Sequence, residues 1–302
     1  MLSVTNLIKS FGDLRAVDGV SFDIEDGSIL GMIGQNGSGK TTIFRMILDF
    51  LTPEEGGTVF WNGEKIGSNI YDIVGYLPEE RGLYESMTIE QQITYFAQLR
   101  GMQKNDIDMK IDEWMKKFDV KGVRTDKIKT LSKGNQQKVQ LIATLIHEPK
   151  LVILDEPFSG LDPVNAELLE KGIIDLKEKG SAIIFSSHNM SNVEEICDKL
   201  VMIHHGKQLL YGEINEVRES FGRTFIYIET SDWTQESLSN LEGVESVIET
   251  RKDNFTLKLE DTSYGKTLFK TISKGDYLPK FSQQPPTLEQ IFKMKAGESI
   301  HE

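Results

Sequence analysis

Residues 34–41 of this 302-residue chain read Gly34-Gln35-Asn36-Gly37-Ser38-Gly39-Lys40-Thr41 and match the phosphate-loop pattern G-x-x-x-x-G-K-[ST]. The apolar run 29–33 precedes this stretch, and apolar residues at helical spacing follow it to residue 50. We therefore predict a strand, a loop and a helix, with backbone N–H groups around a polyphosphate. Lys40 would meet the β- and γ-phosphates, and the Thr41 hydroxyl would bind Mg²⁺. The alternative is an ordinary glycine turn that carries a surface lysine. Such a turn gives no reason for the strand and helix patterns on either side.

A second pattern is the apolar run 151–154, which is followed at once by Asp155 and Glu156. Beside a phosphate loop, this pattern predicts a buried strand whose terminal carboxylate reaches the Mg²⁺ shell. In that interpretation Asp155 holds the metal and Glu156 polarises the attacking water. Two acids at an ordinary solvated strand end are the alternative.

The remaining periodicity predicts an α/β fold with a parallel sheet. Residues 151–154 and 182–185 are short continuous apolar runs, typical of buried parallel strands. Asp162-Pro163 between them is typical of a helix start, and residues 88–148 read as helical with starts at Thr88 and Ser132. Strands that alternate with helices indicate helices packed on a parallel sheet.

The texture changes near residue 220. A strand is predicted at 224–229 and a hairpin at 244–260, with helical patterns at 235–241 and 263–273. We therefore expect two domains: 1–220, with a helical subdomain at about 83–148, and a small α+β domain at 221–302.

The composition excludes some functions. The chain has 34 basic and 47 acidic side chains and a net charge of −13, which argues against binding nucleic acid or anionic lipid. No apolar stretch approaches the roughly 18 residues of a membrane span, and the first residues lack the pattern of a secretory leader. We expect any membrane role to come through a partner. Cys197 is the single cysteine, so we expect a reducing compartment and no cysteine-based zinc site.

The segment Leu131-Ser132-Lys133-Gly134-Asn135-Gln136-Gln137 resembles the signature of the ABC transporter ATPase family, most often Leu-Ser-Gly-Gly-Gln. Ser159-Gly160-Leu161-Asp162 resembles the D-loop of that family, and His188 its switch histidine. Phe11 stands where the family stacks an aromatic ring on adenine. Together these motifs cover residues 2–215, and they imply the ABC-type P-loop ATPase core with antiparallel β and helical subdomains.

The resemblance implies a set of site residues. The catalytic residues would be Glu156, His188 and Lys40, and the metal ligands Thr41, Glu79 and Asp155. ATP would be bound by Phe11, Val17, Gly34, Asn36, Gly37, Ser38, Gly39, Lys40, Thr41, Thr42, Ser132, Gly134 and Asp162. His188 could equally be an ordinary strand-end histidine, and we interpret His204-His205 as two ordinary residues.

The chain departs from the family pattern at three positions. Lys133 replaces a glycine and Asn135 a glutamine in the signature, while Glu79 stands where a glutamine is usual. A carboxylate can still give an oxygen to Mg²⁺, but it adds a negative charge beside the phosphates.

Residues 79–84 and 131–135, with the extension 221–302 that ends in 286–292, resemble bacterial export-type ATPases related to the sodium-extrusion subunit. This resemblance implies a membrane permease as partner, a location on the cytoplasmic face of the membrane, and two ATPase subunits that enclose two ATP molecules. The permease would dock at residues 81–90, where Tyr84 and Met87 are possible contacts, although ordinary packing explains them equally well. The extension would regulate or stabilise the dimer.

Two other functions remain open from the sequence. A soluble ABC-type ATPase could act on ribosomes or DNA, but the chain has one phosphate loop and no sustained heptad run. A degenerate, non-hydrolysing partner subunit is suggested by Lys133, Asn135 and Glu79, whereas Glu156 and His188 favour hydrolysis.

Overall fold

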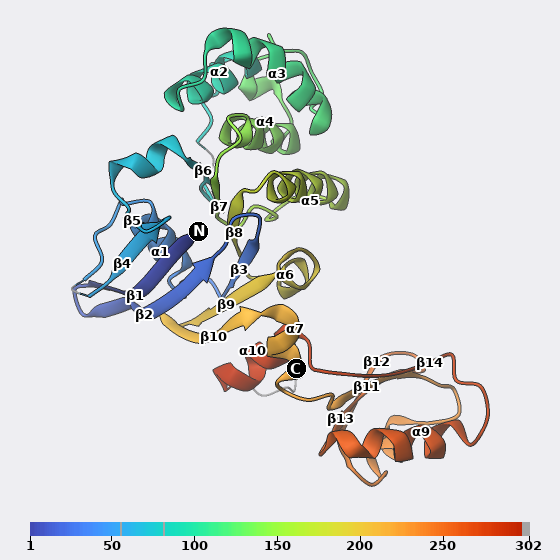
Figure 1. Cartoon of the computed structure of the whole chain (residues 1–302). Helices are drawn as coiled ribbons and strands as arrows, with labels where there is room; N and C mark the ends of the chain where they lie inside the picture. The colour runs from blue at the N-terminus through green and yellow to red at the C-terminus, as the bar shows by residue number, and fades with distance from the viewer. Residues whose placement is uncertain (55, 81, 298–302) are drawn as a thin grey trace. The chain divides into compact units, whose positions relative to one another are not determined.

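The computed structural model describes residues 1–54, 56–80 and 82–297. The chain divides into two compact units, Met1–Gly212 and Glu213–Glu302 (Figure 1). The change of composition near residue 220 comes after this division, because the short helix α7 (Ile214–Glu219) already belongs to the second unit.

One ten-stranded sheet organises the first unit. Its strands are β1 (Leu2–Phe11), β2 (Leu14–Ile24), β3 (Ile29–Ile33), β4 (Thr58–Trp61), β5 (Glu64–Lys65), β6 (Val74–Leu77), β7 (Leu151–Leu154), β8 (Ala182–Ser187), β9 (Lys199–His204) and β10 (Lys207–Glu213). They lie in the order β5-β4-β1-β2-β10-β9-β3-β8-β7-β6. The pairs β3–β8, β3–β9, β7–β8, β6–β7 and β2–β10 are parallel, whereas the pairs β1–β2, β1–β4 and β4–β5 are antiparallel. The carboxyl ends of β3, β7 and β8 therefore meet at one edge.

The helices of this unit are α1 (Lys40–Ile47), α2 (Ile89–Leu99), α3 (Lys104–Lys117), α4 (Lys133–Leu145), α5 (Pro163–Glu178) and α6 (Met190–Ile196), with 3-10 turns at Ser68–Asp72 and Ile128–Thr130. Helices α1, α2, α4 and α5 start where the sequence predicts them. Thr88 caps α2 in a capping box, and Ser132 and Asp162 cap α4 and α5. Helices α2, α3 and α4 pack together, as Figure 1 shows.

The central strands of the sheet are fully buried. Every residue of β3, β7 and β8 is buried, which fits their continuous apolar runs. Among the described residues, none of the helices is long and apolar enough for a bilayer span.

The second unit contains the predicted strand, hairpin and helices. Its elements after α7 are β11 (Phe225–Glu229), α8 (Gln235–Ser239), β12 (Val244–Arg251), β13 (Asn254–Leu259), a 3-10 turn (Thr262–Tyr264), α9 (Gly265–Ser273), β14 (Lys280–Gln284) and α10 (Leu288–Ala296). The β-α-β-β-α-β run and the antiparallel strand order β12-β13-β11-β14 are those of a ferredoxin-like unit. It has its own apolar core.

Candidate active site

The phosphate loop lies between β3 and α1, where the sequence predicts it. Lys40 Nζ donates to the carbonyls of Gly34 at 2.7 Å and Gln35 at 3.3 Å. Gly39, the N-cap residue of α1, has φ 109°, and a Cβ there would lie 2.5 Å from the Ala16 carbonyl oxygen. Only glycine therefore fits this position. The first N–H groups of α1 are thus brought to the concave side of a tight loop, which favours an anion.

Asp155 follows β7 directly and is held by two hydroxyl groups. Thr41 Oγ1 donates to one of its carboxylate oxygens at 2.8 Å, and Ser186 Oγ donates to the other at 2.7 Å. Ser186 Oγ also accepts the backbone N–H of Glu156 at 2.8 Å. Ser186 is a site residue that the sequence analysis missed. Its only signal is its place at the end of the apolar run 182–185.

Glu156 lies between a cation and an imidazole. One carboxylate oxygen is 3.3 Å from Lys40 Nζ, and the other is 2.9 Å from His188 Nδ1. Glu156 is 9% exposed and has φ 50°, a left-handed conformation that few residues other than glycine adopt. The side chain of His188 is 56% exposed, so its ring reaches the surface beside the buried carboxylate.

A cavity of about 460 Å³ joins the phosphate loop to Asp155 and Glu156, and His188 is not among the described residues that line it. Its described lining comprises Phe11, Leu14, Ala16, Asn36, Gly37, Ser38, Gly39, Lys40, Thr41, Thr42, Glu79, Asp155 and Glu156. Leu14 and Ala16 are additions to the predicted set. Val17 is buried behind the loop, and Gly34 contributes through its carbonyl. The exposed ring of Phe11 stands beside the loop, as adenine stacking would require.

Three predicted residues lie elsewhere. Ser132, Gly134 and Asp162 are not among the described residues that line the cavity. Ser132 and Asp162 instead cap α4 and α5, and Gln137 Nε2 donates to the Ser159 carbonyl at 3.2 Å. The signature helix and the segment 159–162 are therefore tied together, and Gln137, Ser159 and Gly160 line a third cavity with Glu79, Asp155 and Glu156.

The residues predicted to bind metal supply only oxygen atoms. Thr41 and Asp155 are in contact, and Glu79 lines the same cavity. In the described residues no three His, Cys, Asp or Glu side chains form a metal cluster. Mg²⁺ fits such a donor set, because it is commonly bound through one or two carboxylates together with substrate phosphates.

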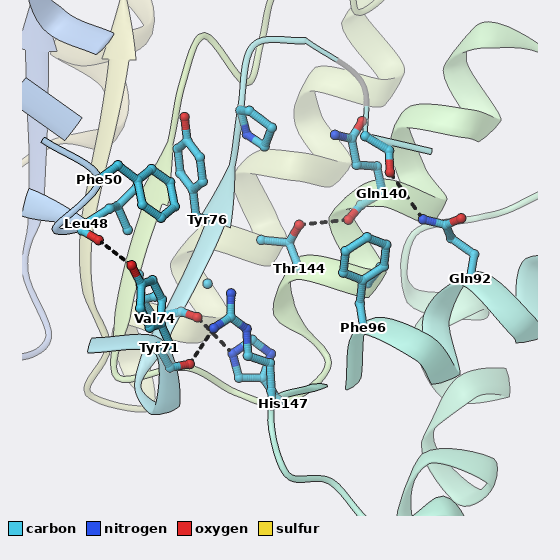
Figure 2. Close-up of a pocket in the computed structure, with 15 residues that line it drawn as sticks. Leu48, Phe50, Tyr71, Val74, Tyr76, Gln92, Phe96, Gln140, Thr144 and His147 are labelled. Atoms are coloured by element: carbon cyan, nitrogen blue, oxygen red, sulfur yellow. Dashed lines mark hydrogen bonds between the residues drawn. The ribbon is translucent and has the colours of Figure 1, made fainter. Parts of the chain in front are cut away.

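A second cavity, of about 240 Å³, lies between the sheet and the helices (Figure 2). Figure 2 shows Phe50 and Tyr71 on one side of it and Phe96 and Gln92 on the other. Arg100 is the one charged side chain in the described lining, and it donates to the Tyr71 carbonyl. Burial lowers the pKa of its guanidinium, which the nearby Asp72 partly offsets.

The segment that leads from β6 borders both cavities. Pro78 and Gly82 line the second cavity, whereas Glu79 lines the first. The predicted docking residue Arg81 lies outside the described residues.

His147 in the wall of the second cavity makes folding stability depend on pH. Burial lowers its pKa from 6.5 to about 4. Between these pH values the unfolded chain binds a proton that the folded chain does not, so the free energy of unfolding falls as pH decreases. We expect a loss of about 3 kcal/mol from this group across the window.

Urea unfolding between pH 4.5 and 7 measures this dependence. The variant His147→Gln should flatten it, whereas His205→Asn, which removes an exposed imidazole from a left-handed position, should not. A pH dependence that persists unchanged in His147→Gln would assign the effect to other groups.

Residues 17–159 match the family model of ABC transporters, and residues 212–296 match the C-terminal domain of DrrA1-3-like ATP-binding proteins. An uncharacterised ABC transporter ATP-binding protein of Alkalihalophilus pseudofirmus is 47% identical over 88% of this chain and 98% of that protein. The lipopolysaccharide export system ATP-binding protein LptB of Haemophilus influenzae is 28% identical over 72% of this chain and 92% of LptB. A solved ATP-binding subunit of an ABC transporter aligns with a TM-score of 0.68 and 28% identity, over 74% of this chain and 93% of that one.

Proposed function

Because this chain belongs to the family of ABC transporter ATP-binding proteins, we propose that it powers a separately encoded membrane permease and that the transport is export. Membership makes it an ATP-binding and ATP-hydrolysing subunit with the ABC ATPase fold, as the resemblance implied. The observation that carries the proposed mechanism is the place of Glu156 between Lys40 and His188. Export is supported by the similarity to LptB, which belongs to a lipopolysaccharide export system.

ATP enters the cavity with its phosphates in the loop 34–42 and its adenine on Phe11. Lys40 then turns from Glu156 to the β- and γ-phosphates, because the triphosphate offers it more negative charge. Thr41, Asp155 and Glu79 would hold Mg²⁺, which when bound neutralises charge on the phosphates. Ser186 keeps Asp155 and the backbone of Glu156 in place.

Release of Lys40 frees one carboxylate oxygen of Glu156 to accept a hydrogen bond from water. Glu156 thereby acts as the base or polariser of the attacking water. His188 donates from Nδ1 to the other oxygen, since a carboxylate only accepts. Nε2 of the same ring then remains for the γ-phosphate, and in the imidazolium form both nitrogens donate.

Ser132, Gly134 and Asp162 serve the nucleotide of a second subunit, either another copy or a close paralogue. Their absence from the described lining of the cavity at their own phosphate loop supports this assignment. The start of α4 at Ser132 provides hydrogen-bond donors that a triphosphate held by one loop still lacks. The first unit, with the helical subdomain at 83–148, forms the nucleotide-binding domain, and the second unit, which contains residues 221–302, regulates or stabilises the dimer.

The permease holds the subunit at the cytoplasmic face of the membrane through the second cavity. Its occupant is a permease segment that brings apolar side chains and one carboxylate. The charge of Arg100 supports this choice. Arg100 forms no ion pair with any described residue, and it is the one charged side chain in the described lining of the cavity. The protein as a whole is acidic. The neighbouring Pro78, Glu79 and Gly82 link this cavity to the nucleotide.

Arg100→Glu tests the docking proposal. The variant replaces attraction by repulsion in a half-buried site, so we expect the membrane-bound fraction of the chain in the source cells to fall about tenfold or more. Lys104→Glu, an equal change of charge at an exposed position outside the cavity, should leave that fraction unchanged.

The purified Arg100→Glu chain should keep its ATPase rate, which separates docking from catalysis. Arg100→Gln retains a donor for the Tyr71 carbonyl, so it tests the loss of charge even if the Arg100→Glu chain misfolds. Normal membrane retention of both Arg100 variants would contradict the docking proposal.

A further inference from the structure

The side-chain amide of Asn135 has a fixed orientation. Its Oδ1 accepts the backbone N–H of Lys121 at 2.9 Å, and its Nδ2 lies 3.1 Å from Ser132 Oγ. A backbone N–H can only donate, so the amide oxygen must face Lys121 and the NH₂ group must face Ser132. Asn135 therefore donates to the Ser132 hydroxyl.

The Ser132 hydroxyl oxygen accepts a second hydrogen bond. The backbone N–H of Asn135 lies 3.3 Å from Ser132 Oγ, as in other serine-capped helices. A hydroxyl oxygen has two lone pairs and one hydrogen. Because two donors occupy the lone pairs, the hydrogen must point away from Asn135, out of the N-terminus of α4.

Helix α4 differs in this respect from two other helices of the chain. In α2 and α10 the third residue is a glutamine, Gln91 or Gln290, whose side chain accepts the backbone N–H of the capping threonine. In α4 the corresponding side chain leaves the cap backbone and contacts the cap hydroxyl and the segment at Lys121 instead. The first turn of α4 also carries Lys133 and no acid, which suits an anion.

We propose that Asn135 is a positioning residue, which fixes the Ser132 hydroxyl as a hydrogen-bond donor to the γ-phosphate of ATP bound by the second subunit. This inference rests on the composite site proposed above. It gives Asn135, which replaces the usual glutamine, a role of its own. The asparagine side chain, which is shorter than that of glutamine, reaches the Ser132 hydroxyl oxygen and orients the hydroxyl hydrogen before the two subunits close. A hydrogen-bond donor that already has the required orientation does not have to reorient when the reaction takes place.

Asn135→Asp tests the inference with almost no change of shape. One carboxylate oxygen still accepts the Lys121 N–H, but the other replaces the donor beside Ser132, so the serine hydrogen turns inward. We expect kcat for ATP hydrolysis to fall about tenfold to a hundredfold, with a smaller change in KM, because the phosphate loop of the binding subunit is untouched.

The double variant with Ser132→Ala separates positioning from charge. If Asn135 acts through Ser132, Asn135→Asp lowers kcat less than about threefold in the Ser132→Ala background. Equal losses in both backgrounds would overturn the inference, since the added charge alone would then explain them. Thermal unfolding of all four proteins checks that none is merely misfolded.

A separate measurement distinguishes a failure of this inference from a failure of the proposed composite site. If Glu156→Gln forms an ATP-dependent dimer, the composite site stands, and additive effects at Ser132 and Asn135 refute only the positioning role. If no dimer forms under any condition that supports hydrolysis, the composite site itself fails.

Discussion

Glu156→Gln loses at least a hundredfold in ATP turnover while it still binds ATP. The amide keeps the size of the side chain and can still contact Lys40 or His188, but it can neither take a proton from water nor polarise it as an anion does. Positioned general bases contribute about 10²- to 10⁴-fold to rates. Because the bound ATP then persists, the variant should also accumulate as an ATP-bound dimer.

Mg²⁺-dependent phosphate release and size-exclusion chromatography with and without ATP measure both effects. Glu167→Gln is the matched control, since Glu167 lies on α5 in an exposed ion pair with Lys171. Its turnover should equal that of the unmodified chain. A Glu156→Gln protein that hydrolyses ATP at the original rate would remove Glu156 from the mechanism.

Lys40→Met has two separable effects, one on ATP and one on folding. Loss of the ammonium should weaken ATP binding about tenfold to a hundredfold, as expected for hydrogen bonds to a charged group. The side chains of Lys40 and Glu156 are both 7% exposed. Removal of one partner of such a buried pair leaves an uncompensated charge, and we expect a loss of about 3 kcal/mol in the free energy of unfolding.

The double variant Lys40→Met/Glu156→Gln distinguishes the two effects. It should regain most of the stability, because no buried carboxylate lacks its cation, and it should still fail to bind ATP tightly. Urea unfolding without nucleotide and titration with a fluorescent ATP analogue give the two quantities. If the double variant is no more stable than Lys40→Met, the pair does not couple in the folded chain.

Local signals in the sequence were sufficient for much of the fold. The glycine spacing before Lys40 predicts strand, loop and helix, because few other backbones place three glycines and a lysine in this way. Thr88, Ser132 and Asp162 predict helix starts through their side-chain oxygens, and the structure confirms all three. These features depend on residues within one turn of each other.

Features that depend on strand order could not be read from the sequence. Ser186 reaches Asp155 only because β8 lies beside β7 in register, which pairs residues about thirty positions apart. The second cavity forms only where β6, α2 and α4 come together, and only this arrangement places Arg100 and His147 in the lining of the same cavity. Asn135 was visible as a departure from a motif, but its partner Lys121 lies on a separate segment.

The segment between the two cavities also sets the scale of any movement. From Pro78 to Gly82 the chain takes four steps, which span at most about 14 Å when fully extended. Pro78 fixes one backbone angle within this span and removes part of its slack. If incoming ATP displaces Glu79, the wall of the second cavity would therefore be displaced as well, because Pro78 and Glu79 are neighbours in the chain and line different cavities.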